Sequence, residues 1–476
     1  MIDEIVELKN NAKEQQVKLE RLSRLVKSRS EKKSDSKDNS DNKKKNHGRL
    51  SADEYKPSKV VSHKHEDMQA GSKCPDCNHG TLQQLKPGKV LRIVGNAPIE
   101  AYLHEPERLR CGGCGNIFVA PMPEEFGDEK ADASANALVA FFRYAMGIPH
   151  YRLAKIQKSM GVPLPVSTQY EMVEMLWTVV VPIFKLLLEL AANSSIIYAD
   201  DTPSKIIEVI SNKQALKDAG ERVGLYTTAI EAEKDGRIIQ LFFTGRKHAG
   251  ENLGELLKNR NSDNSPPIQM TDGSSRNFKN DAMTIVALCL VHGRRGFIDC
   301  EEAFPDESDY VIQRIGTVYK NEKYIKSLNM DDQQRLEYHQ KNSLEPMNEI
   351  KHFAETSIAN KKTEANSSLG VAFKYMLKNW EGLSAFLRIP GAPLDNNAAE
   401  RLVKKYILYR KNSYFYKNEN GAKVGDCLMS IIQTCLTADE NPIDYLTTLQ
   451  KNQKAVAKNP QLWLPWNYRN MTKSVS

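Results

Sequence analysis

The segment from residue 195 to residue 304 constrains the fold most, because its apolar residues follow the period of β-strands. Lys234, Asp235 and Gly236 predict a tight hairpin turn between two of its strand-like stretches. Strands mixed with helices indicate an α/β fold whose sheet has an antiparallel edge. The predicted strands lie in SIIYADDTP (195–203), ERVGLYTTAIEA (221–232), GRIIQLFFTG (236–245), PPIQMTDG (266–273) and IVALCLVHG (285–293).

Helical patterns flank this segment on both sides. Residues 128–192 predict helices with a helix-turn-helix-like arrangement, in which Gly161 breaks one helix and Ser167 or Thr168 caps the next. Arg152, Lys155 and Lys158 are expected on exposed positions there, where DNA contact is one interpretation and an ordinary helix pair the other. Residues 305–390 predict a helical insertion, 391–425 a returning part of the core, and 426–476 a C-terminal helical segment.

The N-terminal 70 residues divide into two parts. In residues 1–26, Ile5, Leu8, Leu19 and Leu22 fall at heptad positions and predict a leucine-zipper-like coiled coil that pairs chains. One amphipathic helix packed on another domain is the alternative. Residues 27–70 begin with a long polar stretch that cannot bury enough apolar surface to offset its ordering entropy. We therefore expect a disordered polar linker.

Residues 71–122 carry four cysteines in two Cys-x2-Cys pairs: Cys74, Cys77, Cys111 and Cys114. Two such pairs bring four thiolates into tetrahedral reach of one ion, as in a structural zinc ribbon. His79 and His104 are alternative ligands. Since four protein ligands leave no open position, the expected Zn²⁺ is structural and the module serves binding.

Charge and apolar composition bear on the partner and the compartment. The 67 Lys and Arg outnumber the 60 Asp and Glu, and the net charge of +7 favours a polyanionic partner. The apolar run 175–184 is too short to span a bilayer and predicts a buried helix. We expect a cytoplasmic protein, in which the remaining cysteines are core residues and not disulfides: Cys289, Cys300, Cys427 and Cys435.

Three acids stand where a two-metal phosphodiester site needs them. Such a site requires oxygen ligands that converge on ions about 3.5–4 Å apart. Asp200 ends one apolar run, Asp272 ends another, and Glu400 opens a helix, so we predict that the three bind two Mg²⁺ or Mn²⁺ ions. Side chains alternate along a strand, so only one of Asp200 and Asp201 can face the site, and Asp200 is the choice.

Each acid also has an ordinary explanation. The adjacent Asp200 and Asp201 could start a turn, and Asp272 followed by Gly273 is a common turn pair. Asn397 followed three residues later by Glu400 matches a capping box. It is the joint arrangement of the three acids that favours the metal site.

Cations and aromatic residues follow Glu400 closely. Arg401, Lys404, Lys405, Arg410 and Lys411 suit contacts to phosphate. The interleaved aromatic residues suit stacking on bases: Tyr406, Tyr409, Tyr414, Phe415 and Tyr416. A solvated helix face is the alternative for such a stripe.

With these residues assembled, the chain resembles the DDE transposases of insertion sequence family 66 (IS66-type). The resemblance rests on CPDC and CGGC, GIPHYRLAKIQKSMGV, YADDTP, IQMTDG, LCLVHGRRGF, PLDNNAAERLVKKYILYRKNSYFY, and the closing segments GDCLMSIIQTC, NPIDYL and WLPWN. After Asp272 the sequence departs from the family, because residues 273–278 replace a Gly-Tyr-rich stretch.

The resemblance implies an RNase H-like catalytic domain, a mixed sheet with helices, whose DDE triad is Asp200, Asp272 and Glu400. It also implies that His292, Arg294 and Arg295 contact DNA or support the site. The expected function is metal-dependent strand cleavage and strand transfer at the terminal inverted repeats and target DNA, by a homodimer or higher oligomer near the nucleoid. Accessory element-encoded proteins are further expected partners. The alternatives are an RNase H-like nuclease or resolvase without strand joining, and a zinc-containing DNA-binding regulator.

Overall fold

The structure is a computed structural model, which describes residues 70–72, 97–103, 105, 107–110, 117–119, 129–277, 284–360, 363–364 and 366–473. The predicted N-terminal coiled coil and the four cysteines predicted to bind zinc lie outside these residues, as does nearly all of the predicted linker. The contacts that follow all belong to the unit that begins at residue 97.

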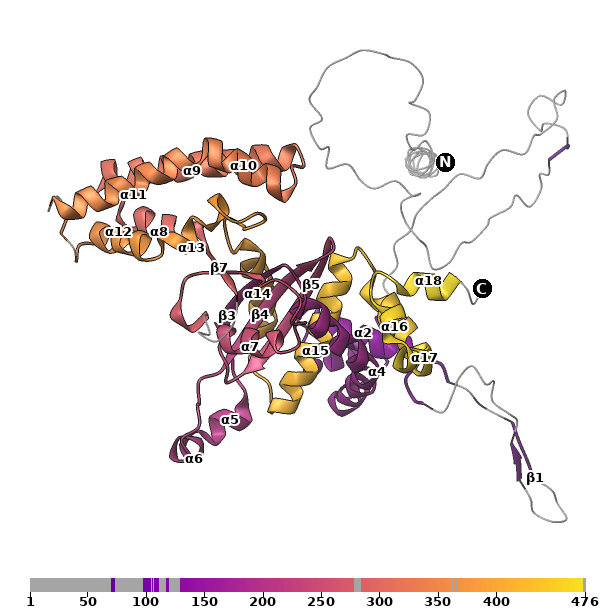
Figure 1. Ribbon diagram of the computed structural model, residues 1–476. Helices are drawn as coiled ribbons and strands as arrows, with labels where there is room; N and C mark the ends of the chain where they lie inside the picture. Colours follow the sequence, from indigo (N-terminus) through magenta and orange to yellow (C-terminus); the bar gives the residue numbers. More distant parts are fainter. Residues whose placement is uncertain are drawn as a thin grey trace, which may run out of the picture. The chain divides into compact units, whose positions relative to one another are not determined.

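A five-stranded mixed sheet forms from the strand-like stretches of the sequence (Figure 1). Its order is β5-β4-β3-β6-β7, with antiparallel pairing from β3 through β4 to β5 and parallel pairing from β3 through β6 to β7. This sheet and its helices fit an RNase H-like domain. The strands are β3 (Ile196–Pro203), β4 (Tyr226–Lys234), β5 (Arg237–Gly245), β6 (Ile268–Thr271) and β7 (Ile285–Leu288).

The predicted hairpin is confirmed, while the last predicted strand proves too long. Asp235 and Gly236 both have positive φ, at 51° and 71°, as a two-residue turn between β4 and β5 requires. Strand β7 ends at Leu288, and Cys289 becomes the N-cap of helix α8 (Leu290–Cys300). The change occurs because the amide of Leu290 donates to the carbonyl of Leu394 and leaves the sheet ladder.

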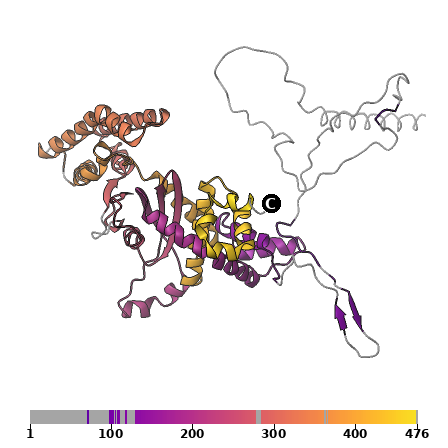
Figure 2. The ribbon, with the colours of Figure 1, turned by 45° about the vertical axis from the view of Figure 1, so that its right-hand side comes forward.

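The apolar run 175–184 lies within one long helix, α4 (Val166–Ala192). Its length and composition would allow it to cross a membrane, but it contacts α2 (Ala133–Tyr144) and α15 (Glu419–Thr437) and contributes buried residues to the hydrophobic core. Figure 2 shows α4 beside the C-terminal helices, which also contact it. Such a helix is typical of a protein interior.

The start of α4 corrects one prediction. Its N-cap is Pro165, and neither Ser167 nor Thr168 caps the helix. The buried side chain of Gln169 donates to the carbonyls of His150 and Leu164, at 3.0 Å each, and so ties the start of α4 to the preceding helix and turn.

Helix α15 closes the edge of the sheet at β5. The amides of Gln240, Phe242 and Thr244 in β5 donate to side chains on successive turns of α15, those of Thr434, Ser430 and Asp426. Every second residue of a strand matches every fourth residue of a helix, since both advance about 6–7 Å. An edge that could pair with another chain is therefore occupied.

The helical elements described between residues 305 and 387 contact the sheet at β7 (Figure 1). Within them Glu322 accepts from Arg335 and lies 2.9 Å from His339, which joins α9 to α10. Arg335 also donates to the carbonyl of Ala392, 2.7 Å away, and so ties this helical part to the segment that precedes α14. The elements are α9 (Pro305–Ser327), α10 (Asp332–Asn342), α11 (Leu344–Ala359), α12 (Ser368–Lys378), α13 (Trp380–Leu383) and the 3-10 turn η4 (Ala385–Leu387).

The remaining elements complete the described chain. They are β1 (Arg108–Arg110), β2 (Ile117–Val119), α3 (His150–Ser159), α5 (Ile207–Ser211), α6 (Lys213–Asp218), α7 (Ala249–Leu257), η3 (Ser275–Asn277), α14 (Asn397–Ser413), α16 (Pro442–Lys451), α17 (Gln453–Lys458), η5 (Pro460–Trp463) and α18 (Tyr468–Lys473). Arg152, Lys155 and Lys158 are exposed on α3, as predicted.

Candidate metal and DNA site

Helix α14 is held in place by the residue that precedes it, Asn396. The side-chain amide of this buried residue donates to the carbonyl of Ala199 in β3, at 3.0 Å. Its backbone amide donates to the Cys289 sulfur at the start of α8, at 3.3 Å. Asn396 therefore joins the helix of Glu400 to the strand that carries Asp200, one residue before that acid.

The capping-box interpretation of Glu400 is wrong. Asn397 is the first residue of α14, and the N-cap is Asn396, whose side chain makes no capping bond. The amide of Asn397 donates to the Asp395 carboxylate at 3.1 Å, and the amide of Glu400 donates to the carbonyl of Asn396 at 3.1 Å. The Glu400 side chain is thus not used to start its own helix.

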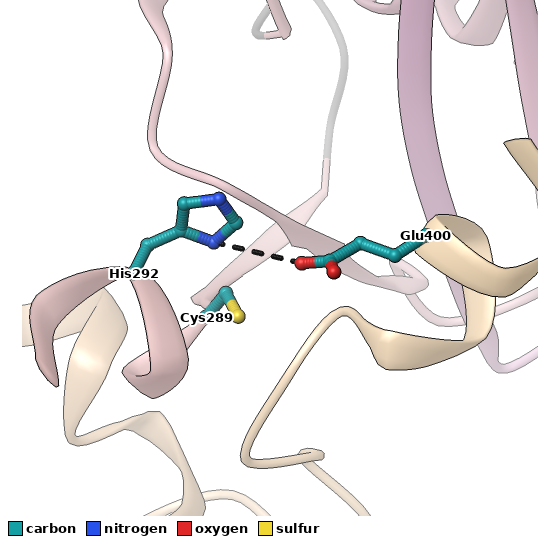
Figure 3. A group of neighbouring side chains, drawn as sticks. All are labelled: Cys289, His292 and Glu400. Atoms are coloured by element: carbon teal, nitrogen blue, oxygen red, sulfur yellow. Dashed lines mark ion pairs between the residues drawn. The ribbon is translucent and has the colours of Figure 1, made fainter. Parts of the chain in front are cut away.

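Glu400 faces the first turn of α8 (Figure 3). Its Oε1 lies 3.9 Å from Nδ1 of His292, too far for a hydrogen bond. Both atoms are buried, and neither has a hydrogen-bond partner among the described residues. The Cys289 sulfur completes a cluster in which one ligand atom of each residue lies within 4.8 Å of the others. The sequence did not single out Cys289, because its apolar neighbours resemble those of any core cysteine.

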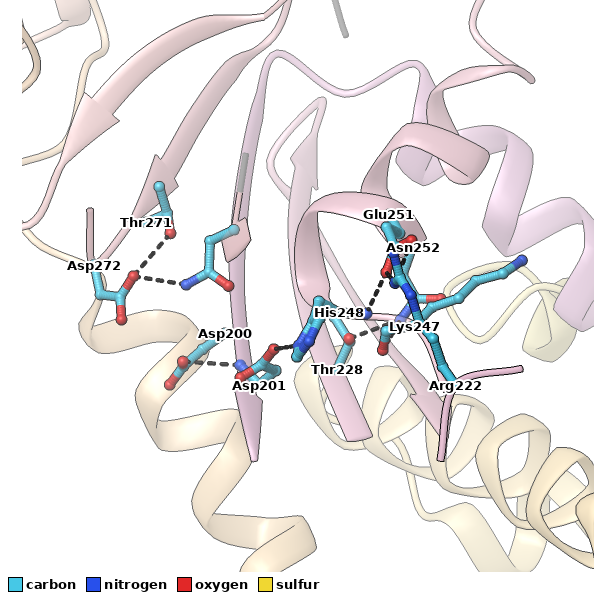
Figure 4. A network of polar contacts seen from close by, with 11 residues as sticks. Asp200, Asp201, Arg222, Thr228, Lys247, His248, Glu251, Asn252, Thr271 and Asp272 are labelled. Atoms are coloured by element: carbon cyan, nitrogen blue, oxygen red, sulfur yellow. Dashed lines mark hydrogen bonds and ion pairs between the residues drawn. The ribbon is translucent and has the colours of Figure 1, made fainter. Parts of the chain in front are cut away.

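Asp200 lies in β3, and Asp272 directly follows the neighbouring parallel strand β6 at an equivalent position. Strand β3 pairs with β6 so that Tyr198 lies opposite Met270. Asp200 comes two residues after Tyr198, and Asp272 comes two residues after Met270. Paired residues of parallel strands project to the same face of a sheet. Figure 4 shows the two carboxylates on the same side of β3.

The pKa of Asp200 reflects both its burial and its acidic neighbours. Burial raises its pKa to about 7, against the hydrogen bond from the Asp201 amide at 2.8 Å, which favours the charged form. The negative charges of Asp272, Asp201 and Glu400 raise this pKa further. A bound cation would remove this cost by stabilising the ionised carboxylate.

Asp201 turns away from this region, as strand alternation requires. Its carboxylate lies 3.2 Å from Nδ1 of His248, the residue that begins α7 (Figure 4). The His248 amide in turn donates to Glu251 at 3.0 Å. Asp201 therefore belongs to a network that packs α7 against β3, on the opposite side from Asp272.

Asp272 is held by the turn that it opens. Its Oδ1 accepts from the amide of Ser274 at 2.8 Å and from the side chain of Asn277 at 2.6 Å. Gly273 has φ of 86°, and a Cβ there would come within 2.9 Å of the Tyr375 hydroxyl. The Asp-Gly turn is thus real, and it orients the carboxylate. Among the described residues, no side chain or amide donates to Oδ2, which leaves that oxygen for another partner.

The predicted DNA-contacting cations divide into two groups. Arg410 donates to the carbonyl of Pro203 and Lys405 donates to Gln240, at 3.2 Å for the lysine, so both hold α14 to the sheet. The others lack such a tether among the described contacts. Arg295, Arg401, Lys404 and Lys411 are exposed and Arg294 is partly exposed.

Three of the five aromatic residues predicted to stack on bases cannot do so. Tyr406, Tyr409 and Tyr416 are buried in the hydrophobic core, because they fall on the inner face of α14 or just beyond its end. Tyr414 and Phe415 remain exposed, at 62% and 49%.

The three acids suit hard divalent ions. Carboxylate oxygens are the ligands that Mg²⁺ and Mn²⁺ prefer. Among the described residues, Glu400 Oε1 is buried without a hydrogen-bond partner, and only one carboxylate oxygen of Asp272 accepts hydrogen bonds. A buried carboxylate left unpaired is costly, and a cation would offset that cost.

A comparison with models of protein families shows to which family the chain belongs. The model described as the Transposase IS66 family matches residues 129–424, which include Asp200, Asp272 and Glu400. The chain belongs to this family of transposases. IS66 membership makes it a DNA-processing protein whose partner is DNA, and such transposases generally use a divalent metal.

Two relatives from Sinorhizobium fredii (strain NBRC 101917 / NGR234) extend over most of the chain. Uncharacterized protein y4jD is 25% identical over 76% of this chain and 71% of its own length. Uncharacterized protein y4hP is 22% identical over 76% of this chain and 67% of its own length. Both relatives therefore resemble this IS66 transposase over most of its length and not only at isolated motifs.

Replacing Asn396 by Ala tests how the site is held. The buried carbonyl of Ala199 would lose its donor, and we expect the free energy of unfolding to fall by about 1–3 kcal/mol. We also expect Mg²⁺ affinity to fall at least about tenfold, the scale on which outer supporting contacts act. Urea unfolding and metal titration measure the two effects.

The neighbouring Asn397→Ala variant is the matched control, because the contact described for Asn397 uses its backbone amide. Loss of Mg²⁺ affinity in both variants to the same extent would show that Asn396 has no special role in placing Glu400.

Proposed function

We propose that this chain is an insertion-sequence transposase that cleaves DNA at the ends of its element and joins them to target DNA by a DDE mechanism. The equivalent placement of Asp200 and Asp272 on neighbouring parallel strands, with Glu400 close enough to influence Asp200, carries the proposal. Family membership supports the reaction class. The finer steps are our inference from this arrangement.

Asp200, Asp272 and Glu400 would hold the divalent ions. When bound there, such ions would supply activation of water, or later of a 3′ hydroxyl, for in-line attack and stabilisation of the leaving oxygen. The acids serve as negatively charged ligands and do not exchange protons with the substrate. The Ser274 and Asn277 donors fix Asp272, and Asn396 fixes the helix of Glu400, so the ligands are positioned before metal enters.

The exposed cations near the acids would bind the DNA backbone. Arg401 and Lys404 lie on the same helix as Glu400, and Arg295 lies on α8 beside His292. Their charges are exposed, which suits phosphate contacts that carry no sequence information. We assign the predicted zinc module, zipper and α3–α4 region to recognition of element ends and to pairing of two protomers in the cytoplasm, at the nucleoid.

The first test replaces each acid by its amide: Asp200→Asn, Asp272→Asn and Glu400→Gln. The amides keep size and remove the charge, so each variant should fold and lose at least about 100-fold in strand cleavage, the scale for one preorganised electrostatic contact. Cleavage and joining are measured with Mg²⁺ or Mn²⁺ on duplexes from the ends of the chain's own element.

Asp201→Asn is the matched control, because Asp201 is the adjacent acid that contacts His248. It should retain most of the activity. Full activity in any of the three amide variants removes that residue from the triad, and cleavage without joining would instead identify a nuclease or resolvase.

The second test uses pH. Burial raises the pKa of Asp200 to about 7, so below pH 7 the metal-free protein holds a proton that a cation must displace. Mg²⁺ affinity should therefore fall by up to about tenfold per pH unit as pH drops below 7, and level off above it. Calorimetry in buffers of different ionisation enthalpy should detect about half a proton released per chain at pH 7.

The Asp201→Asn variant should keep this pH dependence but shift it to somewhat lower pH, because the charge of Asp201 is one of the causes that raise the pKa of Asp200. A Mg²⁺ affinity that stays constant from pH 6 to pH 8 would mean that Asp200 does not bind the ion as a newly ionised group.

A further inference from the structure

The cluster of Cys289, His292 and Glu400 has the dimensions of a site for a second kind of ion (Figure 3). Its ligand atoms lie within 4.8 Å of one another, and the nitrogen and the oxygen are 3.9 Å apart. Tetrahedral Zn²⁺ with bonds of about 2.0–2.3 Å separates its ligands by about 3.3–3.7 Å. Small side-chain rotations would close the difference.

Two atoms of the cluster lack the partners that buried polar atoms normally have. His292 Nδ1 and Glu400 Oε1 are both buried without a hydrogen bond among the described residues, although they face each other. Such unpaired atoms are uncommon in folded proteins and are costly. An ion between them would satisfy both at once.

Cys289 places a sulfur atom at the start of α8. Cys289 is the N-cap of the eleven-residue helix α8, and its sulfur accepts from the amide of Asn396 at 3.3 Å. Burial raises the pKa of the Cys289 thiol, the amides of Asn396, His292 and Val291 act in the opposite direction, and a bound cation would favour the thiolate. A sulfur, an imidazole and a carboxylate together select Zn²⁺ over Mg²⁺, which prefers oxygen ligands.

We infer that Cys289 Sγ, His292 Nδ1 and Glu400 Oε1 form a site for a thiophilic divalent cation such as Zn²⁺, with the fourth position open to water. On binding, the S–H bond breaks, a sulfur–zinc bond forms and the proton passes to the buffer, with no oxidation. The site shares Glu400 with the proposed Mg²⁺ site. Zn²⁺ there would hold this carboxylate on the His292 side and add positive charge, so it would weaken Mg²⁺ binding and inhibit the reaction.

The binding test does not depend on the proposed function. The full chain, with the zinc that it retains after dialysis, is titrated with Zn²⁺ against a chelating indicator. We expect one additional ion per chain, bound with an affinity that Cys289→Ser or His292→Ala lowers by more than the roughly 10–100-fold that loss of an outer supporting contact costs.

Cys300→Ser is the matched control, since Cys300 is the other buried cysteine of α8 and its sulfur contacts Ser308. It should keep the additional ion. The site is refuted if the parent chain binds no additional Zn²⁺, or if Cys289→Ser binds it as tightly as the parent. Circular dichroism melting confirms that each variant is folded.

The activity test concerns the shared carboxylate and rests on the proposed function. Zn²⁺ is added to Mg²⁺-supported cleavage, and each variant is compared with its own activity without Zn²⁺. The parent and Cys300→Ser should be inhibited at concentrations at least about tenfold lower than Cys289→Ser. Equal inhibition of all three would place the inhibitory Zn²⁺ elsewhere. If the parent chain binds the additional Zn²⁺ but cleaves no DNA, the zinc site stands and the transposase proposal is refuted.

Discussion

The hydrogen bond from the Asn396 side chain to the carbonyl of Ala199 fixes where helix α14 meets strand β3. Lys405 and Arg410 hold the later turns of α14 to the sheet, and Asn396 fixes the start of the helix beside Ala199, one residue before Asp200. The backbone amide of Asn396 contacts the Cys289 sulfur and adds the start of α8 to the junction. Asn396 therefore joins strand β3 to the starts of α8 and α14.

At this junction, burial and neighbouring negative charges make the ionised form of Asp200 unfavourable. Burial raises the pKa of Asp200 to about 7, and the charges of Asp272 and Glu400 add to that effect. Glu322, by contrast, is paired with Arg335. A carboxylate with a raised pKa beside further acids is common at functional sites, and a divalent cation would explain why Asp200 is kept there.

Helical elements cover both edges of the sheet. Edge strand β5 is covered by α15, whose Asp426, Ser430 and Thr434 accept its free amides. At the opposite edge, β7 contacts α13 and η4 of the helical part. Arg335 of that part also donates to the carbonyl of Ala392, just ahead of Asn396.

Most features that depend on residues close together in the sequence, such as strand alternation and turns, could be predicted. Alternation limited the site to one of Asp200 and Asp201, and the structure turns Asp201 toward His248. The hairpin at Asp235 followed from turn chemistry. The sheet order fits the RNase H-like domain that the family resemblance implied.

Contacts between distant residues could not be predicted. Asn396 was indistinguishable from its neighbour Asn397, since its partners lie in β3 and α8. The spacing of Tyr406 and Tyr409 marks one face of a helix but does not say whether that face meets DNA or the core, and here it meets the core. Likewise the bond from Gln169 to the carbonyl of His150, which ties the start of α4 to α3, joins residues 19 positions apart.

The most direct test of the central claim is anomalous scattering from crystals of the full chain grown or soaked with Mn²⁺. We predict Mn²⁺ density coordinated by carboxylate oxygens of Asp200, Asp272 and Glu400, with ions about 3.5–4 Å apart once DNA is bound. Mn²⁺ that binds elsewhere while these three carboxylates keep water or protein partners would contradict the claim that the fold assembles them to hold metal.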